Sequence, residues 1–378
     1  MLVAEWMVRN FWFLLYECAP TDERRGRGWR RRHSLAGARG GTSLPDLMLF
    51  RDEQLVVADW VASSDDEGQP VRFVDTGHAE LEPRDIRQAL TTTVDDIVER
   101  LRAVNHPDAA ALREDWGTIL DTSGDDLALC ARAARLGVDA LDDSELTPDL
   151  ESCLGGALGD LPEITRNDVL DAHVGTAPAL KATVAAVRDL VVNGGNAPLR
   201  AGTRSVDVPV SWSGRAFQTG YASARALREH IALEVGRVDL DALFVKLGLR
   251  GAYQECAPLA AHAQHLGALV GMSPRGAPRI FAAPRRSKDA RFQQARCLFA
   301  LGADAAKDAP RAVTAAGTRL QAASRAFAAE LLAPADHLRE RLAGGIDDER
   351  VEGLADELGV APTVIERQIQ NHGIAAER

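Results

Sequence analysis

Two stretches in the last third of the chain decide the fold of its C-terminal part. The first reads Ala290-Arg-Phe-Gln-Gln-Ala-Arg-Cys-Leu-Phe-Ala-Leu-Gly302, and the second reads Gln321-Ala-Ala-Ser-Arg-Ala-Phe-Ala-Ala-Glu-Leu-Leu-Ala-Pro334. Both are rich in alanine and leucine, which favour helices, and they end at a glycine and a proline, which terminate helices. The sequence therefore predicts two helices, over residues 290–302 and 318–332.

A zinc peptidase built on two such helices has a defined ligand spacing. Two histidines one helical turn apart bind the metal, and a glutamate beside the first histidine activates the bound water. A third ligand comes from the neighbouring helix. The two stretches resemble the helices that build this site in ImmA/IrrE-type metallopeptidases, and the residues that fit the scaffold are Arg291, Phe292, Ala295, Phe327, Ala328, Leu331, Leu332 and Pro334.

The chemical positions of that pattern do not hold the family's residues. Arginine has no lone pair to donate, alanine has no ligand atom, and an amide carbonyl is a poor zinc ligand. The resemblance therefore implies a zincin-like domain without catalytic residues, metal or cofactor, in which Arg296, Gln321 and Arg325 are candidate binding residues. The positions of the first histidine, the glutamate, the second histidine and the third ligand hold Arg296, Cys297, Ala300 and Gln321, and Ser324 and Arg325 replace an Ala-Asn pair.

The resemblance covers residues 206–378, which we interpret as one domain. Residues 220–228 and 238–249 are similar to the family's opening helices, and residues 354–360 and 364–372 are similar to helices that follow the zinc site. The alternative is a pair of unrelated alanine-rich helices.

The rest of the chain predicts an α+β fold that is mostly helical. In an N-terminal domain of residues 1–104, segments 44–50 and 54–60 are typical of a β-hairpin, 71–75 of another strand, and 85–103 of an amphipathic helix. Residues 105–205 predict a helical middle region. Further elements are expected as helices at 127–136, 180–192 and 217–233 and as a strand at 280–283.

Composition favours a reduced cytoplasmic compartment, and the resemblance implies a protein of bacterial type. The five cysteines are scattered and form no Cys-x-x-Cys pair, so each is expected to act as a small apolar residue. The apolar run Phe11–Tyr16 is too short to cross a bilayer and predicts a buried helix. A net charge of -11 argues against general nucleic-acid binding.

Two groups of polar residues are weaker site candidates. His262 and His265 would share a face if they lay on one helix and could then bind a metal, although surface histidines are the commoner reading. A basic stretch with a tryptophan could contact phosphates and stack on a base, although a solvated loop is the simpler interpretation. Its residues are Arg24, Arg25, Arg27, Trp29, Arg30, Arg31 and Arg32.

For two further patterns we favour a structural interpretation over a functional one. Asp46 and Asp59 flank the predicted hairpin as the acids of a restriction-nuclease core do, but Val61 stands where that core needs a lysine. Residues 346–378 are typical of a helix-turn-helix, with Asp347 or Asp348 as cap and Gly359 at the turn. Because this segment is acidic, we interpret it as a packing unit rather than a DNA reader.

The resemblance implies a function in regulation. Active proteins of this kind cut repressors or antitoxins, so a member without catalytic residues is expected to bind a protein partner of that type. One alternative is a peptidase that uses Cys297 with His262 or His265, which requires a thiolate near an imidazole. The other is a nucleic-acid-associated protein that acts through residues 24–32.

Overall fold

The computed structural model has an α+β fold, as the sequence predicts, with many helices and two small sheets. It describes residues 1–20, 27–38, 43–63, 71–173, 175–193, 198–202, 206–212, 214–262 and 265–374. The chain forms two compact units: residues 1–159 with 316–318, and residues 160–315 with 319–378. The boundary near residue 160 lies inside the predicted helical middle region, residues 105–205.

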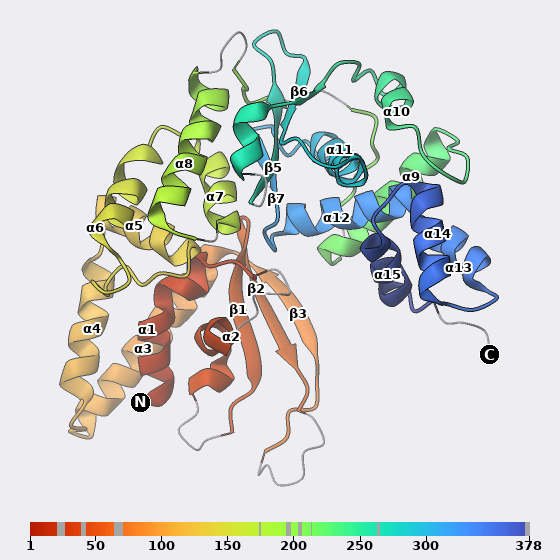
Figure 1. The fold of residues 1–378 in the computed structure, drawn as a ribbon. Helices are drawn as coiled ribbons and strands as arrows, with labels where there is room; N and C mark the ends of the chain where they lie inside the picture. Colours follow the sequence, from red (N-terminus) through yellow and green to blue (C-terminus); the bar gives the residue numbers. More distant parts are fainter. Residues whose placement is uncertain are drawn as a thin grey trace. The chain divides into compact units, whose positions relative to one another are not determined.

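The first unit is built around its N-terminal helix (Figure 1). Helix α1 (Leu2–Tyr16) is buried along most of its length, which confirms the predicted buried helix. Its Phe11 ring meets the rings of Trp12 and Trp116 edge-on at 5.3 and 5.4 Å. The helices that pack on α1 are α3 (Pro83–Ala103), α4 (Ala109–Asp121) and α5 (Gly124–Arg135), and the short α6 (Pro148–Ser152) follows them.

An antiparallel three-stranded sheet completes the first unit. Strands β1 (Asp46–Asp52) and β2 (Leu55–Val61) form the predicted hairpin, with Phe50 opposite Val57. The third strand, β3, comprises Gly77–Leu81, so the prediction of a strand at 71–75 is wrong. Residues 71–75 are mostly exposed, whereas β3 alternates intermediate and exposed side chains and pairs with β2.

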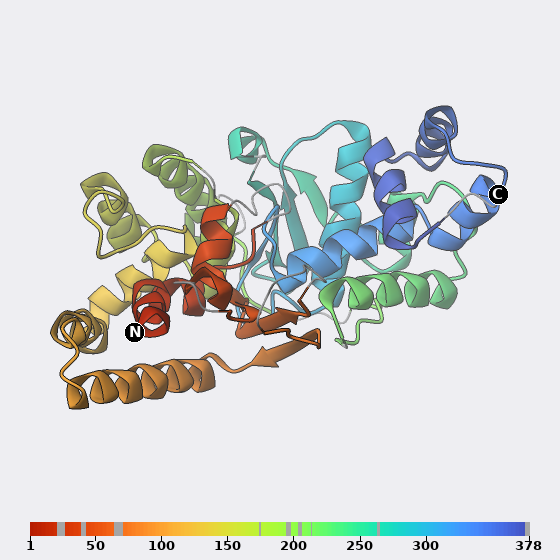
Figure 2. The same ribbon diagram turned by 90° about the horizontal axis from the view of Figure 1, so that it is seen from below.

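The second unit contains a mixed four-stranded sheet in the order β4-β6-β5-β7. Its strands are β4 (Tyr253–Glu255), β5 (Leu266–Met272), β6 (Pro278–Ala282) and β7 (Arg311–Thr314). Helix α11 (Ser287–Gly302) packs against β5, and α7 (Glu163–Ala172) packs against β7. Figures 1 and 2 show the sheet between α7 and α8 (Ala177–Arg188) on one side and α11 on the other, and every residue of β5 is buried.

Helix α12 (Arg319–Leu332) organises the remaining helices of the second unit. It packs along α9 (Ala216–His230) and beside α11, as Figure 2 shows. Gly220 permits the close approach of α9, because a Cβ there would lie 2.2 Å from the Ala323 carbonyl oxygen. The other helices are α10 (Leu240–Lys246), α13 (Ala335–Leu342), α14 (Asp348–Leu358) and α15 (Pro362–Asn371).

The helix-turn-helix pattern has the predicted local geometry. The Asp347 side chain accepts a hydrogen bond from the Arg350 backbone N–H at the start of α14. Gly359 ends the same helix with a φ of 66°, a left-handed conformation that favours glycine. Among the helices in the described part of the chain, none is both long and apolar enough to span a bilayer.

Candidate functional site

Arg296 is the centre of a polar network between α11, α12 and β7. Its Nε donates to Ser324 Oγ at 3.1 Å, and its Nη2 donates to Gln321 Oε1 and to the Thr314 carbonyl oxygen, both at 2.7 Å. These bonds use three of the five N–H groups of a guanidinium and fix its plane. The Nη1 nitrogen makes no hydrogen bond to the described residues.

Gln321 holds the network to the edge of the sheet. Its Oε1 also accepts from the Thr314 backbone N–H at 2.8 Å, and its Nε2 donates to the Ala312 carbonyl oxygen at 2.7 Å. The side chain is 1% exposed, so each of these bonds satisfies a group that has left water. Ser324 Oγ donates to the Gln321 carbonyl oxygen at 2.9 Å and closes the ring of contacts on α12.

The charge of Arg296 is matched by neutral acceptors only. No ion pair involves this guanidinium within the described residues, although protein atoms surround it and only part of its surface meets solvent. Desolvation lowers the pKa of Arg296 to about 9, and the positive charge of Arg325 acts in the same direction. The site is therefore a fixed, electron-poor centre rather than a ligand set for a cation.

Cys297 lies beside this arginine but faces the core. It is 0% exposed and belongs to the main apolar cluster of the second unit. Burial raises the pKa of its thiol to about 12, so it is not a thiolate at neutral pH. A buried and protonated thiol does not favour the alternative in which Cys297 acts as a nucleophile with His262 or His265, and that alternative stays a prediction.

The positions that the resemblance assigns to zinc chemistry meet only in part. Arg296 and Gln321, at the first histidine and third ligand positions, are in direct contact, whereas Ala300 is fully buried and carries no donor atom. Arg325 lies one residue after Ser324 on α12 and is partly buried. In the described ranges, no three histidine, cysteine or acidic side chains are placed to hold a metal ion.

His262 and His265 do not share a helical face. His262 ends the 3-10 helix Ala257–His262, and its Nδ1 contacts Thr183 Oγ1 at 3.2 Å. His265 directly precedes β5, and its ring centroid lies 5.5 Å from that of His173. The weaker interpretation, a two-histidine metal site on one helix, is therefore not supported, because His265 lies in a turn beside β5.

The basic stretch near residue 30 does not present a stacking platform. Trp29 is 6% exposed, donates its Nε1–H to the Cys18 carbonyl oxygen and stacks on His33 at 4.4 Å. Arg32 pairs with Glu17 through two hydrogen bonds, and Arg30 pairs with Asp46. The weaker interpretation, in which Trp29 stacks on a base, is therefore not supported, because the ring is part of the core.

Of the remaining arginines of this stretch, only Arg31 has a described side chain. Arg31 is exposed on the short helix α2 (Arg27–His33). Arg24 and Arg25 lie outside the described residues, as does the side chain of Arg27.

The acids of the hairpin serve structural contacts. Asp46 Oδ1 accepts from Ser34 Oγ at 2.6 Å, in addition to the Arg30 pair. Asp59 Oδ1 lies 2.6 Å from His78 Nδ1 on the adjacent strand. Because Val61 stands directly opposite Asp46, no lysine completes a nuclease-type site on this face.

Two buried ionic groups in the second unit were not apparent from the sequence. Asp168 accepts from Arg311 Nε and Nη2 at 2.8 and 2.9 Å and from the Ala312 N–H at 2.8 Å. Glu330 accepts from Arg225 Nε at 2.8 Å and from Gln368 Nε2 at 2.9 Å. The only signal of the second group in the sequence was Glu330, the single acid of α12, which did not reveal its partners.

No known family model matches the chain, and no curated protein matches it significantly.

Proposed function

We propose that the second unit is an ImmA/IrrE-like pseudo-peptidase domain that binds a protein partner and acts in regulation. The observation that carries this proposal is the Arg296–Gln321 contact. These residues come from two helices, and in the resembled family their positions hold two zinc ligands. Here the Arg296 guanidinium occupies this place and donates hydrogen bonds to Ser324, Gln321 and Thr314.

The chemistry of this centre favours binding over catalysis. A zinc peptidase needs lone pairs directed at the metal and a carboxylate beside the bound water. Arg296 offers only N–H donors, and the neighbouring Cys297 is neutral and buried. The positive charge of Arg296, which no described acid neutralises, favours an acceptor on a partner instead.

An exposed aromatic side chain near the same helices supports a binding role. Trp212 is 41% exposed, and its ring meets Phe299 of α11 edge-on at 5.9 Å. The Arg319 guanidinium, from the start of α12, lies 5.1 Å above the Trp212 ring. Tryptophan and arginine dominate the energetics of protein interfaces, so this pair is a suitable anchor for a partner.

Metal analysis tests the loss of zinc chemistry. Protein purified without a metal-affinity tag is expected to contain far less than one zinc per chain, and near-stoichiometric zinc would refute the proposal. The variant R296H/A300H/Q321E is the informative comparison. It restores three ligands on the two helices, so zinc binding in this variant, but not in R296H alone, would support the likeness of the scaffold.

Partner binding is tested with matched variants. Proteins cross-linked to the full chain in its native host should be lost in Trp212→Ala and retained in the control Arg250→Ala, an exposed arginine that follows α10. Equal recovery with both variants would place the binding surface elsewhere. Recovery of no specific protein with the unaltered chain would contradict a binding role.

A further inference from the structure

Two arginines of the second unit converge on the turn between α14 and α15. Arg237 lies in the segment between α9 and α10, and Arg291 lies on α11. A Cβ at Gly359, the residue that ends α14, would lie 3.0 Å from Arg237 Nε and 3.1 Å from Arg291 Nε. Because both guanidinium groups approach the same point, they are neighbours in space although they are far apart in the sequence.

Arg291 has a structural role in this arrangement. Its Nε donates to the Gly359 carbonyl oxygen at 3.1 Å, and its Nη2 donates to the Val238 carbonyl oxygen at 2.8 Å. A cation at this end of α14 also interacts favourably with the negative end of the helix dipole. These contacts account for the position of Arg291.

Arg237 has no such structural role. It is exposed, and its side chain makes no ion pair or hydrogen bond to any described residue. Two like charges at close range repel each other, and an exposed side chain can turn toward water. The structure nevertheless places the Arg237 guanidinium beside that of Arg291.

The two positive charges are only partly balanced by acids. Desolvation lowers the pKa of Arg291, and the charge of Arg237 acts in the same direction, whereas Asp239 and Asp241 oppose it. Neither acid forms an ion pair with these arginines in the described part of the chain. Asp239 instead accepts a hydrogen bond from the Ala242 backbone N–H at 3.0 Å, at the start of α10. An anion bound to both guanidinium groups would relieve their repulsion.

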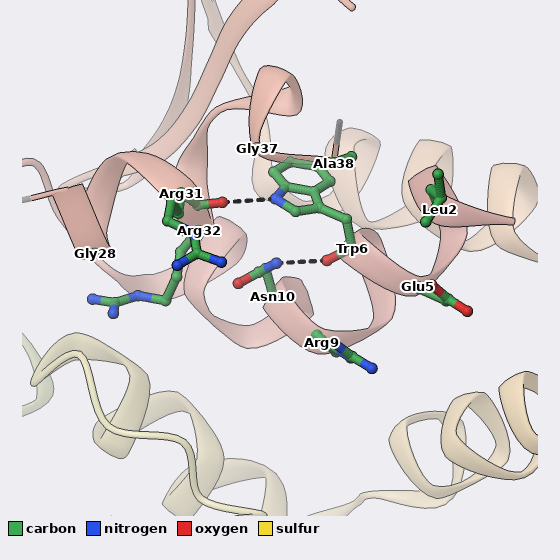
Figure 3. Close-up of a pocket in the computed structure, with 10 residues that line it drawn as sticks. All are labelled: Leu2, Glu5, Trp6, Arg9, Asn10, Gly28, Arg31, Arg32, Gly37 and Ala38. Atoms are coloured by element: carbon green, nitrogen blue, oxygen red, sulfur yellow. Dashed lines mark hydrogen bonds between the residues drawn. The ribbon is translucent and has the colours of Figure 1, made fainter. Parts of the chain in front are cut away.

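The hollow of the first unit does not gather charges in this way. It has a volume of about 370 Å³ and lies beside α1 and α2. Figure 3 shows Arg9 and Glu5 of α1 directed away from Arg31 and Arg32 of α2. The charged side chains drawn around that hollow therefore have no common point for one ligand, unlike the two arginines at the α14–α15 turn.

We propose that Arg237 and Arg291 bind one phosphate group, either as the free anion or as a phosphomonoester. Each guanidinium donates through a planar fork of N–H groups, so arginines from two elements can bind different oxygens of one tetrahedral phosphate. A carboxylate suits this arrangement less well because its two oxygens lie in one plane with a single fork. The proposal goes beyond the function proposed above and does not depend on it.

The neighbouring helix favours a single phosphate over a nucleic acid. Lys288, one turn before Arg291 on α11, already pairs with Asp356 of α14 at 2.6 Å. Nucleic-acid binding needs cations for a run of phosphates, and acids beside the site oppose such a run. The acids of α14, which ends at the site, are Asp348, Glu349, Glu352, Asp356 and Glu357.

Isothermal titration of the full chain with inorganic phosphate and with O-phosphoserine tests the proposal. Both are expected to bind: equal affinities would indicate a site for the free anion, and tighter binding of O-phosphoserine a site for phosphomonoesters. Arg237→Ala should weaken the binding of phosphate roughly tenfold, because it removes charge-assisted hydrogen bonds. Since Arg237 pairs with no described acid, this variant should not lower the melting temperature measured without phosphate.

A charge control separates the site from general attraction. Arg275 is exposed in the turn between β5 and β6, and Arg275→Ala removes the same charge elsewhere on the second unit. It should change the affinity for phosphate less than about twofold.

A steric variant tests the geometry without removing a charge. Gly359 and Gly373 both have positive φ, 66° and 56°, a conformation that asparagine tolerates better than most residues. Gly359→Asn displaces both guanidinium groups, whereas a Cβ at Gly373 meets nothing within 4 Å. Gly359→Asn should therefore weaken the binding of phosphate severalfold, and the matched Gly373→Asn should leave it unchanged.

Four results would overturn the proposal. They are absence of phosphate binding by the unaltered chain, an equal loss of affinity in Arg237→Ala and Arg275→Ala, equal effects of the two asparagine variants, and binding of a single-stranded oligonucleotide without any binding of phosphate.

Discussion

Replacing Gly220 with alanine tests the packing on which the second unit depends. The new Cβ would lie 2.2 Å from the Ala323 carbonyl oxygen, 2.8 Å from Ala326 Cβ and 2.9 Å from the Phe327 nitrogen. Two of these three atoms belong to the backbone of α12, so no rotamer change relieves the contact. Helices α9 and α12 would have to separate by about 0.8 Å to restore the shortest tolerated distance of 3.0 Å.

The expected cost follows from two opposing effects. Overpacking a close interface costs roughly 1–3 kcal/mol, and the upper end applies where backbone must move. Alanine is favoured over glycine inside a helix by about 1 kcal/mol, which offsets part of this cost. The net loss is about 2 kcal/mol, which corresponds to a decrease of about 4–8 °C in the melting temperature of a unit of this size.

Scanning calorimetry of the full chain measures the effect, and the part of the tryptophan fluorescence that Trp212→Phe removes assigns the transition. Trp212 is the single tryptophan of the second unit, since the other five lie in the first. Gly353→Ala is the matched control: it lies within α14, and an added Cβ meets nothing within 4 Å, so it should raise stability by about 0.4–1 kcal/mol. Equal stabilisation by Gly220→Ala would refute the close approach of α9 and α12.

Three further predictions concern buried groups of the second unit. Desolvation lowers the pKa of His372 below its usual 6.5, so below that pH the unfolded chain binds more protons than the folded chain. The free energy of unfolding in urea should therefore be highest above about pH 6.5 and decrease as the pH falls. The decrease should be smaller in His372→Asn. Burial raises the pKa of Cys297 to about 12, and the residue is 0% exposed; mass spectrometry should find the partly exposed Cys256 alkylated in the native protein and Cys297 alkylated only after unfolding. Asp168→Asn leaves the buried Arg311 without its carboxylate and should cost about 3–5 kcal/mol in urea unfolding, whereas Asp160→Asn, which breaks the exposed pair with Arg188, should cost less than about 1 kcal/mol; similar losses would contradict a buried ion pair.

The helices that could be predicted from the sequence have capping or terminating residues at their ends. The strands that were missed have no such short-range pattern. Helix α14 was recognisable because an aspartate caps its start and a glycine ends it, and both signals act within a few residues. Strand β5 was missed because all its side chains are buried, so the sequence shows a continuous apolar run without the alternation that marks a strand. Strand β7 was missed too, because it has only four residues and all of them are buried.

Arg296 and Gln321 were chosen because they fall at ligand positions of the pattern that the two helices resemble, and their role in binding stays a prediction. Their contacts could not be predicted in full. The bonds from Gln321 to Ala312 and Thr314 could not, because they depend on β7, a strand that the sequence did not reveal. Trp29 illustrates the opposite error: arginines surround it in sequence, yet Cys18 and His33 surround it in space.

On the proposed function, Arg296 also explains how a peptidase-like scaffold keeps its shape without zinc. A structural metal contributes directly to folding because it joins ligands from separate elements. Arg296 on α11 likewise joins separate elements, through hydrogen bonds to Ser324 and Gln321 on α12 and to the Thr314 carbonyl oxygen on β7. Glutamine in place of a carboxylate at position 321 leaves the guanidinium charge unneutralised within the described residues. On this proposal the exchange retains a link between the two helices and β7 and leaves a positive centre in place of a metal.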